Sequence, residues 1–441
     1  MVNFVFSKLK YYKLKIYIDK YLLILVNKVI INMFVKKEIK SFMKNVKDLQ
    51  VTGKVVLVRC DFNVPLKDGV IRDDNRIVQA LPTIKELISK GAKVVLMSHL
   101  GKVKHKEAPE VVEAQKAKNN LAPVATRLSE LLAKDVKFCP VTHGDELKNM
   151  VAGLKDGDVL LVQNTRYEKG EEKNDPALAK EWASLCDAFV MDAFGSAHRA
   201  HASTYGVPEA LKAEGKQVAI GYLVEKEVKS LSKVVTCEDR PYIAILGGFK
   251  VSDKIKVINS LLKKCDKILI GGAMAYTFIK ALGGNIGDSP CEEDQLDYAR
   301  EMYASGKILL PEDTKCANDF DNPTETKIVA SKDIPAGFQG LDIGPKTMEK
   351  YANEIAKAKT VFWNGPMGVF EKEAYQAGTI AVCKACADLK DAFTVIGGGD
   401  SAAACKQFGY SDKFSHVSTG GGASLEMIEN DGHLPGIDVI G

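Results

Sequence analysis

The feature that most constrains the fold of this chain is a short apolar run followed directly by a glycine cluster. The pattern is fullest at Thr394–Ala404, where a β-branched run precedes three glycines, Asp400, Ser401 and an alanine-rich stretch. Glycine lets a ligand approach the backbone, and a helix start presents unpaired N–H groups and a positive dipole end. The stretch therefore predicts a strand, a turn and a helix start that binds phosphate.

Asp400 is unusual beside a phosphate site, because a carboxylate repels phosphate unless a divalent cation such as Mg²⁺ lies between them. We therefore predict that Asp400 is a metal ligand and that the phosphate belongs to a metal-bound nucleotide. A single glycine cluster is equally compatible with a tight turn that serves packing alone. The interpretation depends on whether the pattern recurs.

The pattern recurs through the second half of the chain. Strands predicted at Tyr242–Leu246, Lys267–Ile270 and Val361–Trp363 each end in a glycine pair or an Asn-Gly turn. Lys250 and Lys254 follow the first of these strands one helical turn apart, so both amines are expected on one face near a helix start. Glycine loses more backbone conformational entropy on folding than other residues, so packing alone does not explain glycine at so many strand ends.

The first half shows the same alternation of strand and helix. Strands are predicted at Lys54–Cys60 and Lys93–Ser98 with a helix at Asn75–Ser89 between them, and further strands at 136–139, 158–162 and 188–191. Strand, helix and strand with short links form the unit of a parallel sheet. We therefore predict an α/β fold of two Rossmann-like domains, each a parallel β-sheet flanked by helices.

Five segments are expected along the 441 residues. Residues 1–42 form a basic extension, residues 43–220 a first domain and residues 239–424 a second domain. A connecting helix with a hinge is expected at 221–238, where the pattern is helical and carries no candidate site residue. Residues 425–441 are expected to form a C-terminal segment that packs back on the first domain.

The extension differs in kind from the rest of the chain. It holds nine Lys and two acidic residues but no Gly, Ala, Pro or Arg. It lacks the Arg of a mitochondrial transit peptide and the small-residue cleavage site of a secretory signal. A basic amphipathic helix on a membrane and a disordered or non-native start before Met43 both stay open, and we favour the second.

Composition narrows the class of protein. The net charge is +4, but the chain after residue 42 carries 52 basic and 55 acidic residues, which is no nucleic-acid signature. No apolar run reaches membrane-spanning length.

The ten cysteines have no framework spacing, which indicates free thiols in a reducing compartment and hence a cytoplasmic protein. Cys383 and Cys386 lack the second pair that a zinc site needs.

Polar side chains collect at the ends of the first-half strands, where parallel sheets bind ligands. The group contains Arg59, Asp61, Asn63, His99, Lys102, Asn164, Arg166, His198 and Arg199, with Arg76 at a helix start. Each alone is compatible with a solvated loop. Together they predict a small, strongly anionic substrate.

Seven blocks of the sequence, in this order, resemble the phosphoglycerate kinase family across essentially all of residues 43–441. The blocks are VRCDFNVP at Val58–Pro65, SHLGK at Ser98–Lys102, DAFGSAHRAHAS at Asp192–Ser203, LGGFKVSDKI at Leu246–Ile255, FWNGPMGVFE at Phe362–Glu371, GGGDSA at Gly397–Ala402 and STGGGASLE at Ser418–Glu426.

The resemblance implies reversible phosphoryl transfer from 1,3-bisphosphoglycerate to MgADP, giving 3-phosphoglycerate and MgATP, by a monomer without nucleic-acid or membrane partners. The first domain would bind phosphoglycerate. Asp61 and Asn63 would contact its hydroxyl and carboxyl region, and Arg76 the transferring phosphoryl group. Its phosphate and carboxylate would be held by Arg59, His99, Lys102, Arg166 and Arg199.

By the same resemblance the second domain would bind ATP or ADP. Lys250 and Lys254 would face the phosphates and act with Arg76 in catalysis. Glu371 would contact the ribose, and Asp400 would hold Mg²⁺. The remaining nucleotide contacts would come from Gly248, Gly271, Gly272, Gly340, Leu341, Asn364, Gly398, Gly399 and Ser401.

Four residues depart from the usual family pattern. Lys102 stands where Arg is common, Phe249 where a small residue is common, Ala273 in place of a third glycine, and Ser401 in place of Thr. Lys102 keeps the positive charge but loses the bidentate fork of Arg. None of the four removes a necessary charge, so activity is expected with kinetic constants left open.

The residue inventory suits this chemistry without a general acid. The leaving group of an acyl phosphate is a carboxylate, which is stable as an anion, so charge neutralisation and alignment remain as the tasks. Cations, Mg²⁺ and helix starts supply both. Because water would hydrolyse the phosphoryl group, the two domains are expected to close about the hinge.

Two other functions are weighed against this one. Gly397, Gly399 and Ala402 satisfy a G-x-G-x-x-A dinucleotide pattern, which favours an NAD-dependent oxidoreductase, but the next predicted strand lacks the acidic residue that would bind a ribose. A non-enzymatic membrane-associated scaffold would use the basic extension. A Walker A kinase is excluded, because G-x-x-x-x-G-K-[ST] occurs nowhere.

Overall fold

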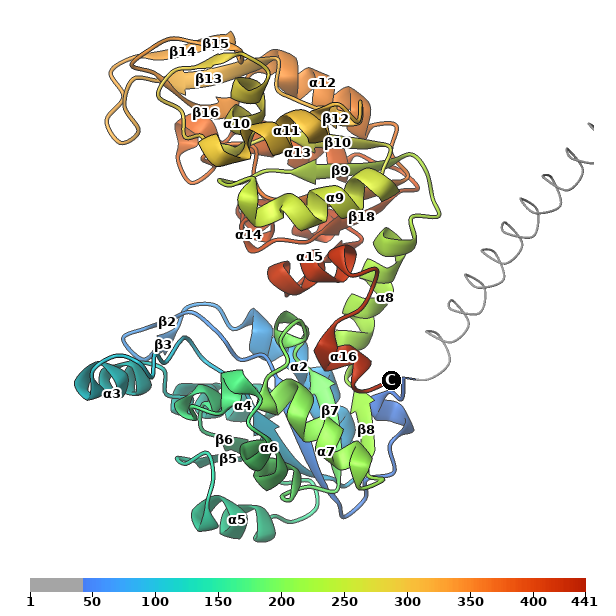
Figure 1. Ribbon diagram of the computed structural model, residues 1–441. Helices are drawn as coiled ribbons and strands as arrows, with labels where there is room; N and C mark the ends of the chain where they lie inside the picture. Colours follow the sequence, from blue (N-terminus) through green and yellow to red (C-terminus); the bar gives the residue numbers. More distant parts are fainter. Residues whose placement is uncertain (1–42) are drawn as a thin grey trace, which may run out of the picture.

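The computed structural model describes residues 43–441 and shows two lobes joined by one long helix (Figure 1). The chain completes most of the first lobe before the helix and builds most of the second lobe after it. The interpretation of residues 1–42 as a basic extension lies outside the described residues.

The first lobe contains a six-stranded parallel sheet in the order β5-β6-β4-β1-β7-β8. Its strands are β1 (Val55–Cys60), β4 (Lys93–Met97), β5 (Val136–Cys139), β6 (Val159–Val162), β7 (Ala188–Asp192) and β8 (Gln217–Ile220). Helices cover both faces, so successive strand residues enter different cores: Val56 and Val58 pack on one side and Leu57 on the other. The helices are α2 (Asn75–Ser89), α3 (Pro109–Lys118), α4 (Ala122–Leu132), α5 (Asp145–Ala152), α6 (Pro176–Ala183) and α7 (Val207–Ala213).

The second lobe repeats this plan with a parallel sheet in the order β12-β10-β9-β17-β18-β19. Its strands are β9 (Tyr242–Leu246), β10 (Lys267–Ile270), β12 (Ile308–Leu309), β17 (Thr360–Asn364), β18 (Phe393–Ile396) and β19 (His416–Val417). Its helices are α9 (Ile255–Lys264), α10 (Met274–Ala281), α11 (Leu296–Tyr303), α12 (Pro345–Ile355), α13 (Ala377–Ala387), α14 (Gly399–Gln407) and α15 (Gly421–Glu429). The prediction of two parallel sheets flanked by helices is confirmed.

Several predicted elements coincide with the observed ones. The helix at Asn75–Ser89 and the strands at Val136–Cys139, Tyr242–Leu246 and Lys267–Ile270 have the predicted bounds. Most other strands differ by one residue at one end, and the strand predicted at Val361–Trp363 is one residue longer at both ends. β8 and β12 were not predicted. Long apolar runs between turn residues explain the agreement, because they admit few alternative boundaries.

The second lobe also carries a small antiparallel sheet that the sequence did not predict. Its order is β14-β13-β16, with β14 at Thr326–Ala330, β13 at Asp313–Ala317 and β16 at Gln339–Ile343. β14 is an edge strand exposed along nearly its whole length, so it lacks the apolar pattern by which a strand is recognised. Two-stranded pairs complete the structure: β2 (Leu66–Lys67) with β3 (Val70–Ile71), and β11 (Asn285–Ile286) with β15 (Asp333–Ile334).

The connecting helix α8 (Tyr222–Thr236) is bound to both lobes by buried carboxylates. Asp192, at the end of β7, accepts hydrogen bonds from the backbone N–H groups of Leu223 (3.0 Å) and Val224 (3.3 Å) at the helix start. Glu227 is fully buried and accepts from the Thr419 backbone N–H (2.7 Å) in the segment after β19. α8 is therefore fixed to the first sheet at one end and to the edge of the second sheet along its side.

Glu227 makes two further contacts, one with His416 in β19 and one with the hydroxyl of Thr419. Its Oε2 lies 2.6 Å from His416 Nε2, and its Oε1, which accepts from the Thr419 backbone N–H, also accepts from Thr419 Oγ1 at 2.8 Å. The chain then returns to the first lobe, where α16 (Pro435–Asp438) lies against it (Figure 1). There the Gly436 N–H donates to the Ala197 carbonyl at 2.8 Å. The exact domain boundaries stay a prediction.

Replacing Glu227 with Ala should loosen the attachment of α8 to the second lobe. The change leaves buried donors of Thr419 and His416 without an acceptor, so the free energy of unfolding should fall by about 3 kcal/mol. Urea titration of Glu227→Ala against Glu225→Ala, which removes a carboxylate from the same helix, measures this. An equal loss in both variants would contradict it.

Candidate functional site

Asp61 and Arg76 form an ion pair at the edge of the first lobe that faces the second. Asp61 follows β1 and is buried, while Arg76 lies in the first turn of α2 and is about one-third exposed. Burial raises the pKa of the Asp61 carboxyl, but the charges of Arg76 and Arg59 and the hydrogen bond from the Asn63 N–H oppose this effect and leave the pKa below its ordinary value. Asp61 is therefore an anion among the cationic side chains of Arg59 and Arg76, and these residues with their neighbours are called the cationic cluster below.

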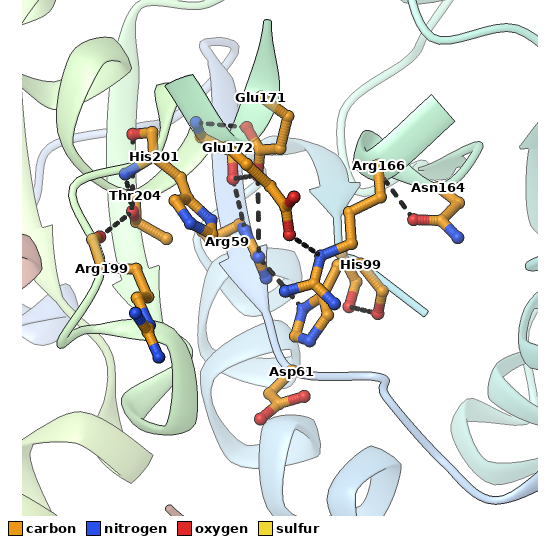
Figure 2. Close-up of polar contacts among 12 residues, drawn as sticks. Arg59, Asp61, His99, Asn164, Arg166, Glu171, Glu172, Arg199, His201 and Thr204 are labelled. Atoms are coloured by element: carbon orange, nitrogen blue, oxygen red, sulfur yellow. Dashed lines mark hydrogen bonds and ion pairs between the residues drawn. The ribbon is translucent and has the colours of Figure 1, made fainter. Parts of the chain in front are cut away.

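Arg59 lies behind this edge, in the interior of the first lobe. Its side chain is 1% exposed, and its N–H groups donate to Ser203 Oγ (2.7 Å), to the Cys60 carbonyl and to His99 Nδ1 (3.2 Å). Figure 2 shows the guanidinium between Glu171 and His99. The structure therefore engages Arg59 with protein groups, whereas the resemblance implies contact with substrate; its role stays a prediction.

His99 presents its other ring nitrogen away from Arg59. Burial lowers the pKa of His99, and the charges of Arg59, Arg166 and Arg76 lower it further against the opposing effect of Asp61. The ring is therefore neutral near pH 7. Because Nδ1 accepts from Arg59, Nε2 carries the proton and is free to donate to an anion.

Loops after three adjacent strands are bonded together around Gly101. The Gly101 N–H donates to Asn63 Oδ1 (2.8 Å), and Arg166 Nη1 donates to the Gly101 carbonyl (2.6 Å). Asn164 Oδ1 accepts from the N–H groups of Leu100 (3.1 Å) and Arg166 (3.0 Å). The structure thus brings Asn63, Asn164 and Arg166 together, as the strand-end argument predicted.

The side chains of Lys102 and Arg199 are exposed. Arg166 is half-buried, and its Nε lies 3.2 Å from Glu172 Oε1. The cations around the cluster therefore differ in freedom: Arg166 is held by the protein, whereas Lys102 and Arg199 extend into solvent.

His201 and Glu171 belong to this cluster but were not singled out from the sequence. Burial, with the charges of Arg59, Arg166 and Arg199, lowers the pKa of His201 to about 4. Glu171 is fully buried and accepts from the backbone N–H and the hydroxyl of Ser203 (2.9 and 2.5 Å). The HRAH pattern was a signal for His201, but no local pattern marks a carboxylate in the short helix at Glu171–Lys173.

In the second lobe, Lys254 reaches back to the end of β17. Its Nζ donates to Asn364 Oδ1 and to the Asn364 carbonyl (3.1 Å). Burial lowers the pKa of Lys254 to about 8, with Asp400 and Asp253 opposing the shift. Asn364 Nδ2 in turn donates to the Gly397 carbonyl (2.9 Å). The expected phosphate-binding loops therefore meet at one place.

Ser401 joins the loop after β17 to the first turn of α14. It is fully buried in the first turn of α14, and its hydroxyl accepts from the Gly365 N–H (2.6 Å). Asp400 and Gly399 precede it and are exposed, as is Lys250. Asp400 and Lys250 thus remain accessible while Ser401 is used to join two loops.

The glycines at these strand ends serve two different purposes. A Cβ on Gly247 would lie 1.9 Å from the Pro366 carbonyl oxygen, and one on Gly365 2.3 Å from the Gly247 carbonyl oxygen. A Cβ on Gly272 would lie 2.6 Å from the Gly248 nitrogen, but one on Gly399 would meet nothing within 4 Å. The first three allow backbones to pack closely, whereas Gly399 leaves open space above the helix start.

The residues expected around the adenine and ribose lie farther along the second lobe. A Cβ on Gly340 would lie 2.0 Å from Tyr276 Oη, and one on Gly271 2.4 Å from Met367 Sδ. Leu341 is 5% exposed and packs in a small apolar cluster with Tyr375. Glu371 is exposed. Gly271 and Gly340 are thus buried against side chains of the second lobe, and the nucleotide contacts of these positions stay a prediction.

A short segment, Thr419–Gly421, contacts both halves of the candidate site. The Thr419 carbonyl accepts from Arg76 Nη2 at 3.4 Å. A Cβ on Gly420 would lie 2.8 Å from Gly195 Cα in the first lobe, and one on Gly421 3.2 Å from Gly398 Cα in the second. Arg76 and the Gly398 turn therefore lie on the same side of the molecule, with this segment between them.

Comparison with known proteins decides the family. A family model described as phosphoglycerate kinase matches residues 46–431. Phosphoglycerate kinases of Staphylococcus aureus strains JH9 and Newman are 55% identical over 403 residues, covering 90% of this chain and 98% of each relative. The chain belongs to the phosphoglycerate kinase family.

Solved structures of phosphoglycerate kinases agree with this assignment. The enzyme from Coxiella burnetii superposes with a TM-score of 0.78 at 38% identity, and that from Pyrococcus horikoshii OT3 with 0.77 at 32%. In both cases the match covers 90% of this chain and 98% of the solved one.

Family membership confirms the predicted activity. The chain is a glycolytic kinase that transfers a phosphoryl group from 1,3-bisphosphoglycerate to ADP. In the reverse direction its substrates are 3-phosphoglycerate and ATP. The oxidoreductase and scaffold alternatives receive no support. No helix within residues 43–441 is long and apolar enough to cross a membrane.

The lowered pKa of Lys254 predicts a basic limb in the pH profile of phosphoglycerate kinase activity. If Lys254 faces the nucleotide phosphates as expected from the sequence, its ammonium form attracts them. The population of this form falls about tenfold between pH 7 and pH 9 when the pKa is about 8. kcat/KM for MgATP should fall with it. In Lys254→Arg the guanidinium stays charged, so this limb should disappear even if turnover is lower. A flat profile in the unaltered protein would contradict the prediction.

Proposed function

We propose that this phosphoglycerate kinase binds phosphoglycerate at the cationic edge of the first lobe and MgATP at the glycine turns of the second, with in-line transfer between them. The observation that carries the proposal is the position of Thr419–Gly421, which contacts Arg76 on one side and the Gly398 turn on the other. Two anion-binding edges separated by one short segment suit direct transfer without a covalent enzyme intermediate.

For phosphoglycerate, we assign the contacts to groups that remain accessible at the first-lobe edge. Lys102 and Arg199 neutralise its phosphate and carboxylate, together with Arg166 and the Nε2–H of neutral His99. Asp61 and Asn63 bind the hydroxyl and carboxyl region. Arg59, whose N–H groups point to protein atoms, orients His99 and Ser203 from behind.

Arg76 is assigned to the transferring phosphoryl group. Its charge is neutralised by Asp61, and Nη2 donates to the Thr419 carbonyl. A guanidinium with a planar fork can exchange these partners for phosphoryl oxygens.

For the nucleotide, we assign the phosphates to the Gly398–Ser401 turn, to Asn364 and to the lysines at 250 and 254, with Gly248 close by. The open space at Gly399 and the first turn of α14 favour an anion there. Gly271, Gly272, Gly340 and Leu341 are assigned to the adenine, and Glu371 to the ribose. Ser401 acts by holding the turn through Gly365 rather than by contact with phosphate.

Mg²⁺ is assigned to the nucleotide substrate, with Asp400 as the protein ligand. Mg²⁺ in nucleotide sites is commonly bound by one or two carboxylates together with substrate phosphates. Asp400 fits this requirement, because its carboxylate is exposed next to the open helix start. Among the described residues, no group of three or more His, Cys, Asp or Glu side chains is placed to hold a metal.

The chemistry then requires alignment and neutralisation only. The acyl-phosphate leaving group is a carboxylate, so no proton must be supplied to it, and the carboxylate of 3-phosphoglycerate needs no base to attack in reverse. Arg76, Lys250 and Lys254 offset the charge that spreads over the phosphoryl oxygens in the transition state. The neutral histidines of the first lobe donate hydrogen bonds without adding a proton-transfer step.

Coupled assay of 3-phosphoglycerate with MgATP tests the nucleotide half of the proposal. Lys250→Ala and Asp400→Ala should each lower turnover by about 100-fold or more, because each removes a charge at the transferring group or its metal. Both side chains are exposed, so thermal stability should stay close to that of the unaltered protein. Lys263→Ala, at the exposed far end of α9, is the matched control. Normal turnover in both site variants would show that the assignment is wrong.

Closure of the lobes about α8 is a second part of the proposal. Phosphoryl transfer in competition with hydrolysis requires exclusion of water. The joint presence of 3-phosphoglycerate and a non-hydrolysable MgATP analogue should therefore reduce the radius of gyration measured by small-angle X-ray scattering. Each ligand alone serves as the control. Identical scattering in all samples would argue against hinge closure.

We further propose that the enzyme is a cytoplasmic monomer. All ten cysteines are free thiols in the structure, which suits a reducing compartment. The two substrate-binding edges are contributed by one chain, so the site needs no second copy.

A further inference from the structure

The loop that carries the two lysines is fixed by a carboxylate from a distant part of the sequence. Glu292 lies in the segment just before the short helix at Glu293–Gln295. Its Oε2 accepts from the backbone N–H groups of Val251 (2.6 Å) and Ser252 (3.0 Å), and its Oε1 accepts from Ser252 Oγ (2.5 Å). Val251 and Ser252 are two of the three residues between Lys250 and Lys254.

The contact satisfies donors that no helix bond can reach. Val251 precedes the single turn Ser252–Lys254, which leads directly into α9, and the first N–H groups of such a turn have no partner within it. A carboxylate is the strongest acceptor for them and is stabilised by the helix dipole. Glu292 therefore occupies the start of this helix, and recognition of phosphate here is left to the lysine side chains.

Glu292 is itself fixed to the second lobe. Its backbone N–H donates to Thr277 Oγ1 at 3.2 Å, and Thr277 is buried in α10. The carboxylate thus connects the lysine loop to a rigid helix instead of to solvent.

The lysine loop has anchors on both sides of an exposed tip. Before the tip, the Gly247 N–H donates to the Asn364 carbonyl (3.0 Å), and the Gly248 carbonyl accepts from the Met274 N–H (3.1 Å). The tip contains Phe249, which is 65% exposed, and exposed Lys250. After the tip, Glu292 supplies the anchor.

We propose that Glu292 is a positioning residue for phosphoryl transfer, which sets Lys250 and Lys254 relative to each other and to Asn364. The inference rests on the proposed function, because it assumes that the two lysines face the transferring phosphoryl group. Glu292 itself does not touch the substrate. It acts by restricting the backbone from which both lysines extend.

The expected signature is a loss of kcat with little change in KM. Lysines that are displaced by about 1 Å lose transition-state stabilisation of up to about 100-fold. MgATP in the ground state would still be held by the Gly398–Ser401 turn and Asp400. Glu292→Ala should therefore lower kcat about 30- to 100-fold while KM for MgATP changes less than about threefold.

Glu292→Gln provides the rescue. The amide oxygen can still accept from both backbone N–H groups, and the amide NH₂ can donate to Ser252 Oγ, so kcat should stay within about fivefold of the unaltered protein. Glu293→Ala is the matched control, because it removes the neighbouring carboxylate, which pairs with exposed Lys280. It should leave kcat unchanged.

A double-mutant cycle separates positioning from general stability. If Glu292 acts through Lys254, Glu292→Ala should cost far less in the Lys254→Ala background than in the unaltered protein, since the two effects are coupled. Hydrogen exchange should rise at residues 248–254 in Glu292→Ala and stay unchanged in the sheet strands. Equal losses of kcat in both backgrounds, or unchanged kcat in Glu292→Ala, would overturn the proposal.

The same experiment distinguishes its failure from failure of the proposed function. Full turnover in Lys250→Ala and Lys254→Ala would refute the lysine assignment itself, whereas loss in those variants with full turnover in Glu292→Ala refutes only the positioning role. If Glu292→Ala does not fold, Ser252→Ala removes one of the three bonds and should lower kcat about threefold at constant KM. Unchanged kcat there would count against the proposal.

Discussion

Close backbone packing between the ends of β9 and β17 is the constraint on which the second half of the site depends. Gly247 and Gly365 approach so closely that a Cβ on either would overlap the other's loop. This approach brings the Asn364 side chain within reach of Lys254 and of the Gly397 carbonyl. Glycines at strand ends that the sequence suggests for ligand binding thus serve first to pack the two loops together, and the open space lies at Gly399.

In the first lobe the constraint is electrostatic, because several arginine side chains lie close together and need carboxylates beside them. Burial lowers the pKa of Arg59, the charges of Glu171 and Asp61 oppose part of this shift, and His99 stays neutral. Asp61 also pairs with Arg76 at the lobe's edge. Carboxylates at these points neutralise the cluster in the free enzyme and leave the exposed cations available to an anionic substrate.

The two lobes are connected by elements that contact both of them. α8 is capped by Asp192 of the first lobe and bound through Glu227 to the segment after β19 of the second. That segment continues through Thr419–Gly421, which contacts Arg76 and the Gly398 turn, into α15 and back to the first lobe at α16 (Figure 1). A movement at the connecting helix would therefore also move the segment that lies between Arg76 and the Gly398 turn.

The sequence by itself determined the two parallel sheets, most of their strands, the placement of cations after one sheet and glycines after the other, and the family. Those features are local, because an apolar run and the residue that ends it are adjacent in the chain. Only the tertiary structure decided that Arg59 lies behind His99, that Glu171 and His201 join the cluster, and that Glu292 fixes the lysine loop. These depend on contacts between residues 32 to 144 positions apart, which no local pattern specifies. Burial and partners, which decide whether a charge binds substrate or supports its neighbour, exist only once the chain has folded.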